Sequence, residues 1–333
     1  MNVLQSQTIL VTGANGGLGL ETCKHLIDDG VAKIFLACRT MEKAIGAREA
    51  LLAHAGSSLS THLVPAGGFD MTDPLAIREA VAALDFEHPL DIVFLQAGGV
   101  VFGSKRKHVH FNGQNVERTV FQNVVGAHVT LMALLDNGAI AKNARVVFAG
   151  GEGARGLPGL IESPKISLPS ELRHAIFEDE QQSGEDYVDM NAMGISKFVG
   201  ALWVQKIAEL YVHQMSVVWF TPGLTAGTNG LAGVGSLKKF IAENIGFPLM
   251  VLFGKAQTPS QGARKFADCL EGKVGKNGEL LGAPKDKALG ALQDQIPMHP
   301  GFSDASLRDA LWDILGDVCG VSDITSRESS PAL

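Results

Sequence analysis

The feature that most constrains the fold is an alternation of short apolar runs with helical patterns. The runs are rich in β-branched residues and lack polar alternation, which is typical of strands buried on both faces. Parallel strands need crossover segments, and helical patterns fill that role here. The expected strands are Thr8–Val11, Lys33–Ala37, His62–Pro65, Asp91–Gln96, Arg145–Ala149 and Ser216–Phe220, and the expected helices are Leu18–Ile27, Met41–Ala55, Asp73–Leu84, Val116–Leu135 and Met190–Tyr211. This order predicts a doubly wound α/β fold with a parallel sheet of about seven strands.

The chain has 333 residues, of which 46% are hydrophobic, enough for a large buried core. We expect one extended domain over residues 1–321, with insertions at about 151–187 and 221–255, and a polar tail at 322–333. Both insertions follow the carboxyl ends of expected strands, where open α/β sheets bind ligands.

Composition and charge exclude several classes of function. The net charge of −7 argues against a nucleic-acid partner, which selects a basic face. Four distant cysteines without a CxxC pair predict reduced thiols, with no disulfide set and no metal site. The longest apolar run, Gly246–Gly254, is far shorter than the ~20 residues that cross a bilayer, and the N-terminus lacks a signal-peptide pattern. We therefore expect a cytoplasmic protein without a transmembrane segment, either a monomer or a homodimer.

The second insertion is unusually apolar for a segment beside a ligand site. It contains Leu237, Phe240, Ile241, Ile245 and Phe247. We interpret it as a lid over a bulky, apolar small-molecule substrate. The alternative is that it contacts a partner protein or a membrane surface.

A glycine-rich turn, Thr12-Gly13-Ala14-Asn15-Gly16-Gly17-Leu18-Gly19, joins the first strand to the first helix. Such a turn brings backbone N–H groups and the positive end of the helix against a pyrophosphate. The position near the N-terminus, between strand and helix, favours a dinucleotide site over an ordinary tight turn.

The three residues between Gly13 and Gly17 resemble the turn of the short-chain dehydrogenase/reductase superfamily, which has a Rossmann fold. The resemblance covers about residues 7–284. It is strongest to retinol-dehydrogenase-like and protochlorophyllide-reductase-like members, through LACRTMEKA, NVVGAH and FGKAQTPSQGARKFADCL. The resemblance implies that a nicotinamide dinucleotide is bound by Gly13, Asn15, Gly16, Gly17, Leu18, Gly19, Arg39, Asp70, Met71, Ala97, Gly98, Asn123, Lys197, Pro222, Gly223, and Thr225 or Thr228.

Arg39 decides which nucleotide we expect. It follows the second strand, at the place where an acidic residue would bind an adenosine ribose 2′-hydroxyl. A guanidinium suits a 2′-phosphate better, so the sequence predicts NADP(H). The alternative is a solvated surface arginine.

The superfamily reduces carbonyls with an Asn-Ser-Tyr-Lys set, and this chain departs from it. Lys197 and Asn123 match, but Met193 stands at the tyrosine position and Gly150 or Gly151 at the serine position. A thioether has no proton to donate. Three nearby residues are candidates for an alternative acid: Glu152, Asp189 and Tyr187. For each of them, a solvated loop position without a catalytic role is the simpler interpretation.

We therefore predict an NADPH-dependent oxidoreductase with an atypical active site, acting on a bulky apolar substrate in specialised metabolism. Hydride transfer to an already cationic acceptor, such as an iminium, needs no acid. Two alternatives keep the cofactor site without net redox chemistry: a non-redox isomerase, lyase or pericyclase, and an NADP-binding pseudoenzyme.

Overall fold

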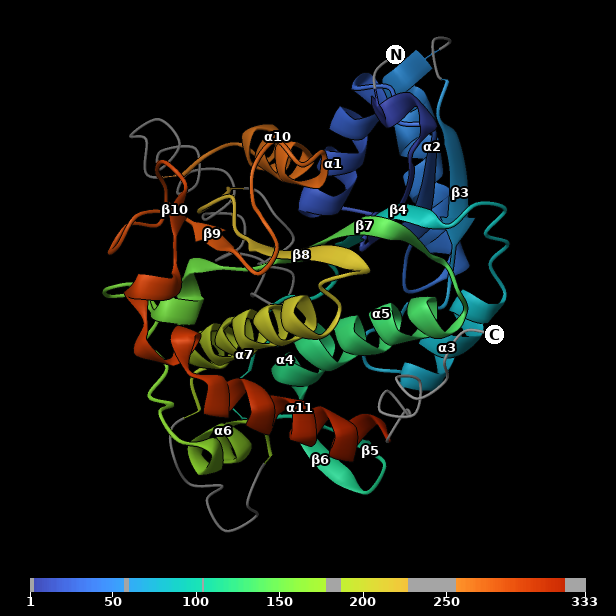
Figure 1. The fold of residues 1–333 in the computed structure, drawn as a ribbon. Helices are drawn as coiled ribbons and strands as arrows, with labels where there is room; N and C mark the ends of the chain where they lie inside the picture. The colour runs from blue at the N-terminus through green and yellow to red at the C-terminus, as the bar shows by residue number, and fades with distance from the viewer. Residues whose placement is uncertain (1–2, 57–59, 104, 178–186, 227–255, 321–333) are drawn as a thin grey trace.

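A computed structural model describes residues 3–56, 60–103, 105–177, 187–226 and 256–320. In these ranges an eight-stranded sheet lies between layers of helices (Figure 1). All neighbouring strands pair in parallel except the last pair, which is antiparallel. Across the sheet the order is β3 (His62–Ala66), β2 (Lys33–Ala37), β1 (Thr8–Thr12), β4 (Leu90–Leu95), β7 (Ile140–Ala149), β8 (Met215–Phe220), β9 (Leu280–Gly282) and β10 (Gln293–Asp294). The predicted doubly wound parallel sheet is confirmed.

Helices cover both faces of the sheet (Figure 1). One face carries α1 (Gly17–Asp28), α2 (Met41–Ala55) and α10 (Pro259–Leu270), and the other carries α3 (Pro74–Ala82), α5 (Gly126–Asp136) and α7 (Asp189–Leu210). Outside the second layer lie α6 (Pro169–Ile176) and α11 (Ala305–Cys319). Short 3-10 turns span Val3–Ser6, Glu152–Arg155, Ile296–Met298 and Pro300–Ser303.

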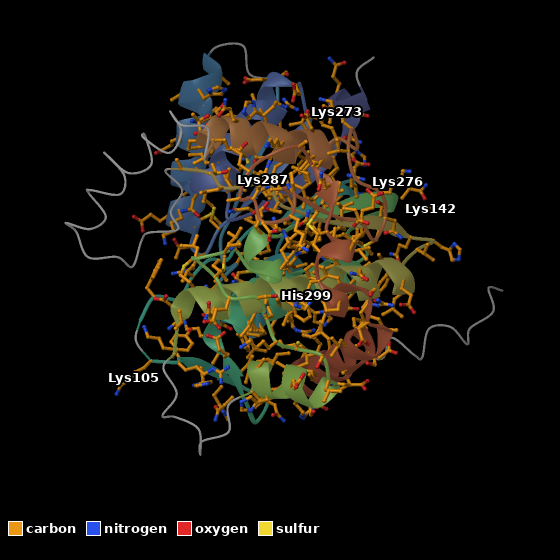
Figure 2. All side chains as sticks on the ribbon, turned by 90° about the vertical axis from the view of Figure 1, so that its left-hand side faces the viewer. Lys105, Lys142, Lys273, Lys276, Lys287 and His299 are labelled. Atoms are coloured by element: carbon orange, nitrogen blue, oxygen red, sulfur yellow. The ribbon has the colours of Figure 1, made fainter. Side chains whose placement is uncertain are left out.

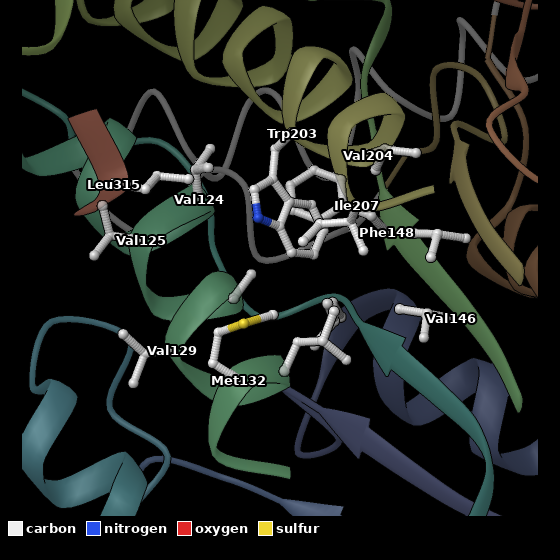
Figure 3. Packing of buried hydrophobic residues seen from close by; sticks show 14 of the residues in the cluster. Val124, Val125, Val129, Met132, Val146, Phe148, Trp203, Val204, Ile207 and Leu315 are labelled. Atoms are coloured by element: carbon white, nitrogen blue, oxygen red, sulfur yellow. The ribbon is translucent and has the colours of Figure 1, made fainter. Parts of the chain in front are cut away.

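Each face of the sheet has its own apolar core. Figure 3 shows the larger one, where Trp203 and Ile207 of α7 pack toward Phe148 of β7 and Met132 of α5. The rings of Phe148 and Trp203 are 5.3 Å apart, and both side chains are fully buried. These contacts fix α7, which carries several candidate site residues, against the strand that ends beside them.

The expected helix Val116–Leu135 is wrong at its N-terminal end. Residues His108–Phe111 (β5) and Gln114–Glu117 (β6) form an antiparallel hairpin instead, with its turn at Asn112-Gly113. Asn112 and Gly113 have φ of 47° and 76°, the left-handed conformations that a tight hairpin turn requires. The helix begins only after Glu117, as α4 (Arg118–Val120), a π-helical segment (Phe121–Val125) and then α5.

The sequence analysis also missed β9, β10, α6 and α11. The two strands have three and two residues, too short for a periodic pattern. Parts of both predicted insertions, residues 178–186 and 227–255, and the predicted tail lie outside the described residues. The single-domain arrangement of residues 1–321 stays a prediction. No helix among the described residues has the length and hydropathy needed to cross a membrane.

Two helix glycines provide a test of the packing. A Cβ at Gly200 of α7 would lie 2.5 Å from the ring of Phe148, whereas one at Gly46 of α2 would meet nothing within 4 Å. We expect Gly200→Ala to lower the free energy of unfolding by ~1–3 kcal/mol through overpacking. Gly46→Ala should raise it by up to ~1 kcal/mol, the difference in helix propensity. Urea denaturation measures both, and equal effects would contradict the packing described.

Candidate active site

The register of the sheet brings the predicted site residues to one edge. Thr12 pairs with Ala37, Leu95 with Phe148, and Ala149 with Phe220, so the carboxyl ends of β1, β2, β4, β7 and β8 lie together. This is the edge at which open α/β sheets bind ligands.

The glycine-rich turn has the geometry of a phosphate-binding loop. Gly13 and Gly17 have φ of 70° and 54°, which favour glycine. A Cβ at Gly19 would lie 2.3 Å from the carbonyl oxygen of Gly13, so the turn can close only without side chains there. In the described part of the chain no side chain caps the N-terminus of α1, so N–H groups of its first turn can bind an anion.

Thr12 and Gln96 join this turn to the end of β4. The Thr12 hydroxyl accepts hydrogen bonds from the backbone N–H groups of Gln96 and Ala97, at 2.9 and 3.0 Å, and donates to the Phe94 carbonyl at 3.2 Å. Oriented so that its nitrogen donates, the Gln96 amide lies 3.3 Å from the carbonyl oxygens of Thr12 and Gly13. Sequence reasoning did not single out Gln96 as a support of the turn.

Arg39 and Asp70 lie together past the ends of β2 and β3. Arg39 Nε is 3.5 Å from Asp70 Oδ2, and the arginine side chain is 62% exposed. The same carboxylate accepts hydrogen bonds from the N–H and hydroxyl of Thr72. Burial acts to raise the pKa of Asp70, but these hydrogen bonds and the charge of Arg39 outweigh it and hold the pKa below its ordinary value.

Met71, the residue after Asp70, is buried against the start of α5. A Cβ at Gly126 would lie 2.6 Å from the Met71 carbonyl oxygen, so α5 approaches this loop through a glycine. Met71 is thus placed beside Asp70, between the end of β3 and the start of α5.

Asn123 lies in the π-helical segment, a distortion that is frequent at functional sites. Its Oδ1 accepts from the Gly99 N–H at 2.7 Å, and its Nδ2 donates to the Gly99 carbonyl at 3.1 Å. A Cβ at Gly98 would lie 2.1 Å from Asn123 Oδ1. The asparagine therefore fixes the glycine segment after β4 and also faces α7.

On α7, Met193, Ser196 and Lys197 share the surface that faces Asn123 and the end of β7. Asn123 Nδ2 lies 3.5 Å from Met193 Sδ and donates to Ser196 Oγ at 2.9 Å. The Ser196 hydroxyl donates back to the Met193 carbonyl at 2.8 Å, so its one proton is engaged. Met193 is partly exposed and stands one helical turn before Lys197, as the sequence predicted.

Lys197 is a buried amine that forms no ion pair among the residues described. Its Nζ donates to the Ala149 carbonyl at 2.7 Å and lies 5.8 Å from the centre of the Phe148 ring. Burial lowers its pKa to about 8. Its other N–H groups are directed to no acceptor in the described ranges, which suits a ligand hydroxyl.

The space for a serine side chain differs between Gly150 and Gly151. A Cβ at Gly150 would lie 2.3 Å from the indole of Trp219, which is fully buried in β8. At Gly151 it would lie 3.2 Å from Lys197 Cγ, a tight but flexible contact. A side chain fits at the second position more easily than at the first.

The three candidate acids have different surroundings. Glu152 is buried, and its carboxylate accepts from the Thr221 hydroxyl at 2.8 Å and the Ala283 N–H at 3.2 Å. It is therefore not the solvated loop charge considered above. The Asp189 carboxylate accepts from the Gly103 N–H at 3.3 Å.

Tyr187 points to the hairpin. Its hydroxyl donates to Glu117 at 3.1 Å, and burial, with the Glu117 charge, raises its pKa to about 12. The second tyrosine of the sequence, Tyr211, donates to Met132 at the far end of α7. Neither tyrosine forms a hydrogen bond with Lys197 or Asn123.

The segment after β8 is fixed by residues that the sequence analysis did not identify. The Pro222 carbonyl accepts from Gln257 at 2.7 Å and from Lys265 at 3.0 Å. The Thr225 hydroxyl donates to the Gly223 carbonyl at 3.0 Å and accepts from Gln257 at 3.1 Å. Thr228 lies outside the described residues.

A cleft of about 710 Å³ lies behind this segment. It is lined by residues of α1, of α10 and of the loop before β10: His25, Ala256, Gln257, Ser260, Gln261, Arg264, Lys265, Leu289 and Gly290. Gln257 and Lys265, which bind the Pro222 carbonyl, are thus among the residues that line the cleft.

Taken together, the turn, the strand ends and α7 belong to a doubly wound α/β fold with the predicted site residues at the carboxyl edge of its sheet. Residues 7–159 match the family model described as short chain dehydrogenase. The short chain dehydrogenase sol3 of Alternaria solani is 28% identical over 247 residues, 72% of this chain and 80% of that protein. A chloroplastic protochlorophyllide reductase of Chlamydomonas reinhardtii is 25% identical over 329 residues, 96% of this chain and 79% of that protein.

Solved structures agree in fold. A short-chain type dehydrogenase/reductase from Mycobacterium marinum superposes with a TM-score of 0.55 at 16% identity, over 83% of this chain and 92% of that one. A short chain dehydrogenase from Burkholderia cenocepacia, solved in complex with NADP, gives 0.53 at 20% identity, over 83% and 96%. The predicted resemblance is confirmed: the chain is similar to short-chain dehydrogenases/reductases and shares their fold.

The buried amine of Lys197 predicts a pH dependence of stability. Between its folded pKa of about 8 and its ordinary value of 10.5, the unfolded chain binds this proton more fully than the folded chain. Its contribution to stability therefore rises with pH in that window. We expect the free energy of unfolding of the native chain, relative to Lys197→Met, to increase by ~1–3 kcal/mol between pH 8 and 10.5.

Urea denaturation at several pH values measures this difference. Lys142→Met is the control, because Lys142 is exposed and lies at the edge of the molecule in Figure 2. If the difference in free energy of unfolding between the native chain and Lys197→Met does not change with pH, as expected for the control, the burial of the amine is contradicted.

Proposed function

We propose that this chain is a short-chain oxidoreductase that uses NADPH to reduce a bulky apolar substrate whose hydride acceptor is already cationic. The observation that carries the proposal is the Met193 thioether, which faces Asn123 one turn before Lys197, at the position that the family resemblance assigns to the tyrosine acid. Around it, Ser196 donates to a backbone carbonyl and Asn123 to a backbone carbonyl and Ser196. Among the described residues, the hydroxyl beside Met193 is that of Ser196, and its proton is donated to the Met193 carbonyl and not to the position of a nascent alkoxide.

The described residues fit the cofactor. NADPH would supply a hydride at the edge of the sheet. The turn Gly13–Gly19 and the uncapped start of α1 would bind its pyrophosphate, and Lys197 has free donors for a ribose hydroxyl. The segments after β4 and β8, namely Ala97–Gly98 and Pro222–Thr225, would position its nicotinamide end.

The preference for the 2′-phosphate rests on Arg39. The guanidinium is mostly exposed, and Asp70 keeps it beside the end of β2, where the adenosine ribose would lie. A phosphate dianion would form a bidentate, charge-assisted contact with the guanidinium there, whereas a bare 2′-hydroxyl carries no charge for it to pair with.

Removing the guanidinium tests this preference. Arg39→Ala should weaken NADPH binding by ~1–3 kcal/mol, the range for hydrogen bonds to charged groups, and leave NADH binding nearly unchanged. Calorimetric titration of both nucleotides measures it, with Arg48→Ala on the exposed face of α2 as the control. If the native chain prefers NADH, the assignment of Arg39 is wrong.

The substrate class is inferred from the apolar residues within 221–255 and from their place after β8. A cationic acceptor explains why an apolar side chain replaces the acid, since reduction of an iminium yields a neutral amine without a proton donor. We assign the reaction to specialised metabolism because the chain keeps the family's cofactor-binding residues while departing from its ordinary carbonyl chemistry.

The acid can be restored by substitution. We expect the native chain to reduce 2-methyl-3,4-dihydroisoquinolinium and to be inactive on 1-tetralone, a neutral ketone of similar size. Met193→Tyr should gain measurable ketone reduction, because Lys197 and Asn123 already stand beside the new phenol, and should lose iminium reduction as the ring fills the pocket. General acid help of ~10²–10⁴-fold makes the two acceptors distinguishable.

Met193→Leu is the matched control, since it keeps the volume and also lacks a proton; iminium reduction should persist in it. A large gain of Met193→Tyr on both acceptors would point instead to an ordinary reductase that has lost its acid. Consumption of NADPH, followed at 340 nm, separates the proposal from a non-redox catalyst or a protein that only binds the nucleotide.

A further inference from the structure

One carboxylate connects the ends of three neighbouring strands. Glu152 begins the 3-10 turn after β7 and is 7% exposed. Its Oε2 accepts from the hydroxyl of Thr221, the residue after β8, at 2.8 Å. Its Oε1 accepts from the backbone N–H of Ala283, the residue after β9, at 3.2 Å.

We propose that Glu152 is a positioning residue which, through Thr221, places the segment Pro222–Thr225 against the nicotinamide end of the cofactor. This inference rests on the proposed function, which assigns that segment to the nicotinamide. Glu152 acts through Thr221 and so is distinguished from the candidate acid role considered from the sequence.

The close packing of the turn makes the contact rigid. A Cβ at Gly194 of α7 would lie 2.8 Å from the Gly153 carbonyl oxygen, so the turn approaches α7 through a pair of glycines. The next residue of the turn with a long side chain, Arg155, donates to Gln295 at 2.8 Å and to the carbonyls of Pro284 and Lys287 at 2.9 and 2.8 Å. Lys287 lies on the face of the molecule shown in Figure 2.

The loop fixed by Arg155 continues to the same segment. The Leu224 N–H donates to the Ala288 carbonyl at 2.6 Å, and Gly223, with φ of 91°, leaves no room for a side chain beside Leu289. Glu152 therefore contacts Thr221, the residue just before the segment Pro222–Thr225, directly. Arg155 supports the same segment through residues 283–288. Gln257 and Lys265 bind the Pro222 carbonyl from the α10 side.

The charges around Glu152 come from three elements. Arg155 lies on its own turn, Lys265 faces it from α10, and Asp286 of the loop faces Arg155. Burial raises the pKa of Glu152, while the Thr221 and Ala283 hydrogen bonds and Arg155 act in the opposite direction. A protonated carboxyl would have a hydrogen on one of the two accepting oxygens, so acidification through this raised pKa should weaken the contact.

The test compares two ligands on the full chain by calorimetry. NADPH reaches both halves of the site, whereas adenosine 2′,5′-bisphosphate reaches only the adenine half. We expect Glu152→Gln to raise the Kd for NADPH about tenfold, the effect of one hydrogen bond to a charged group, and to change the Kd for the bisphosphate less than twofold. Thr221→Val should reproduce this pattern and provides a second route if Glu152→Gln does not fold.

Thr221→Ser keeps the hydroxyl and should bind NADPH as the native chain does, and so should Glu162→Gln, an exposed carboxylate of the same insertion. On acidification, the affinity for NADPH relative to that for the bisphosphate should fall in the native chain and stay constant in Glu152→Gln, because both ligands carry the 2′-phosphate and only NADPH reaches the segment that Glu152 positions. Equal weakening of both ligands, or no weakening of either, overturns the positioning role. A native chain that binds neither ligand overturns the proposed function together with this inference.

Discussion

The parallel hydrogen-bond register of the central strands is the constraint on which the site depends. Five strands end at one edge, at Thr12, Ala37, Leu95, Ala149 and Phe220, so five loops from distant parts of the sequence meet there. The strands are buried on both faces, so a slip of one residue would exchange the side chains of the two cores. The register is therefore fixed by packing over the whole sheet.

Close packing of other atoms against glycines, which have no side chain, then brings the loops into contact. The Gly13 carbonyl fills the space beside Gly19, the Asn123 amide the space beside Gly98, and the Trp219 ring the space beside Gly150. At each of these positions an atom from another part of the chain occupies the place of a side chain. The abundance of glycine in this sequence, 39 residues, thus has a steric reason at the site as well as a conformational one in turns.

The sequence predicted the first four strands to within about one residue and the edge of the sheet at which the site lies. Those predictions depend on local apolar runs and on strand order, both readable along the chain. The hairpin was missed although Asn112-Gly113 is a typical hairpin turn. The reason is that the helix which follows the hairpin was predicted to begin too early, at Val116. The hydrogen bond from Tyr187 to Glu117, at a sequence separation of 70, could not be predicted without that hairpin.

Side-chain partners brought together by the tertiary fold were the least predictable part of the site. Glu152 stands in a polar, glycine-containing stretch that resembles a solvated loop, yet its burial follows from the approach of Gly153 to Gly194 and from the hydroxyl and N–H that later strands supply. Its partners Thr221 and Ala283 are 69 and 131 residues away in the sequence.

The contacts of the cofactor-binding segments are largely separate from those of the atypical positions. A hydrogen bond between Thr12 and Gln96 joins the glycine-rich turn to the end of β4, and Arg39 forms an ion pair with Asp70. Neither contact involves Met193. Met193 meets Asn123 and Ser196, and the indole of Trp219 fills the space beside Gly150. Asn123 meets both Met193 and the glycine segment after β4, but the glycine-rich turn and the Arg39–Asp70 pair share no partner with Met193 among the described residues. Since residues that share no partners contribute nearly independently, the chemistry at position 193 can change while these parts of the dinucleotide fold persist. That independence is the physical reason why the fold and the cofactor class are readable from this sequence and the reaction is not.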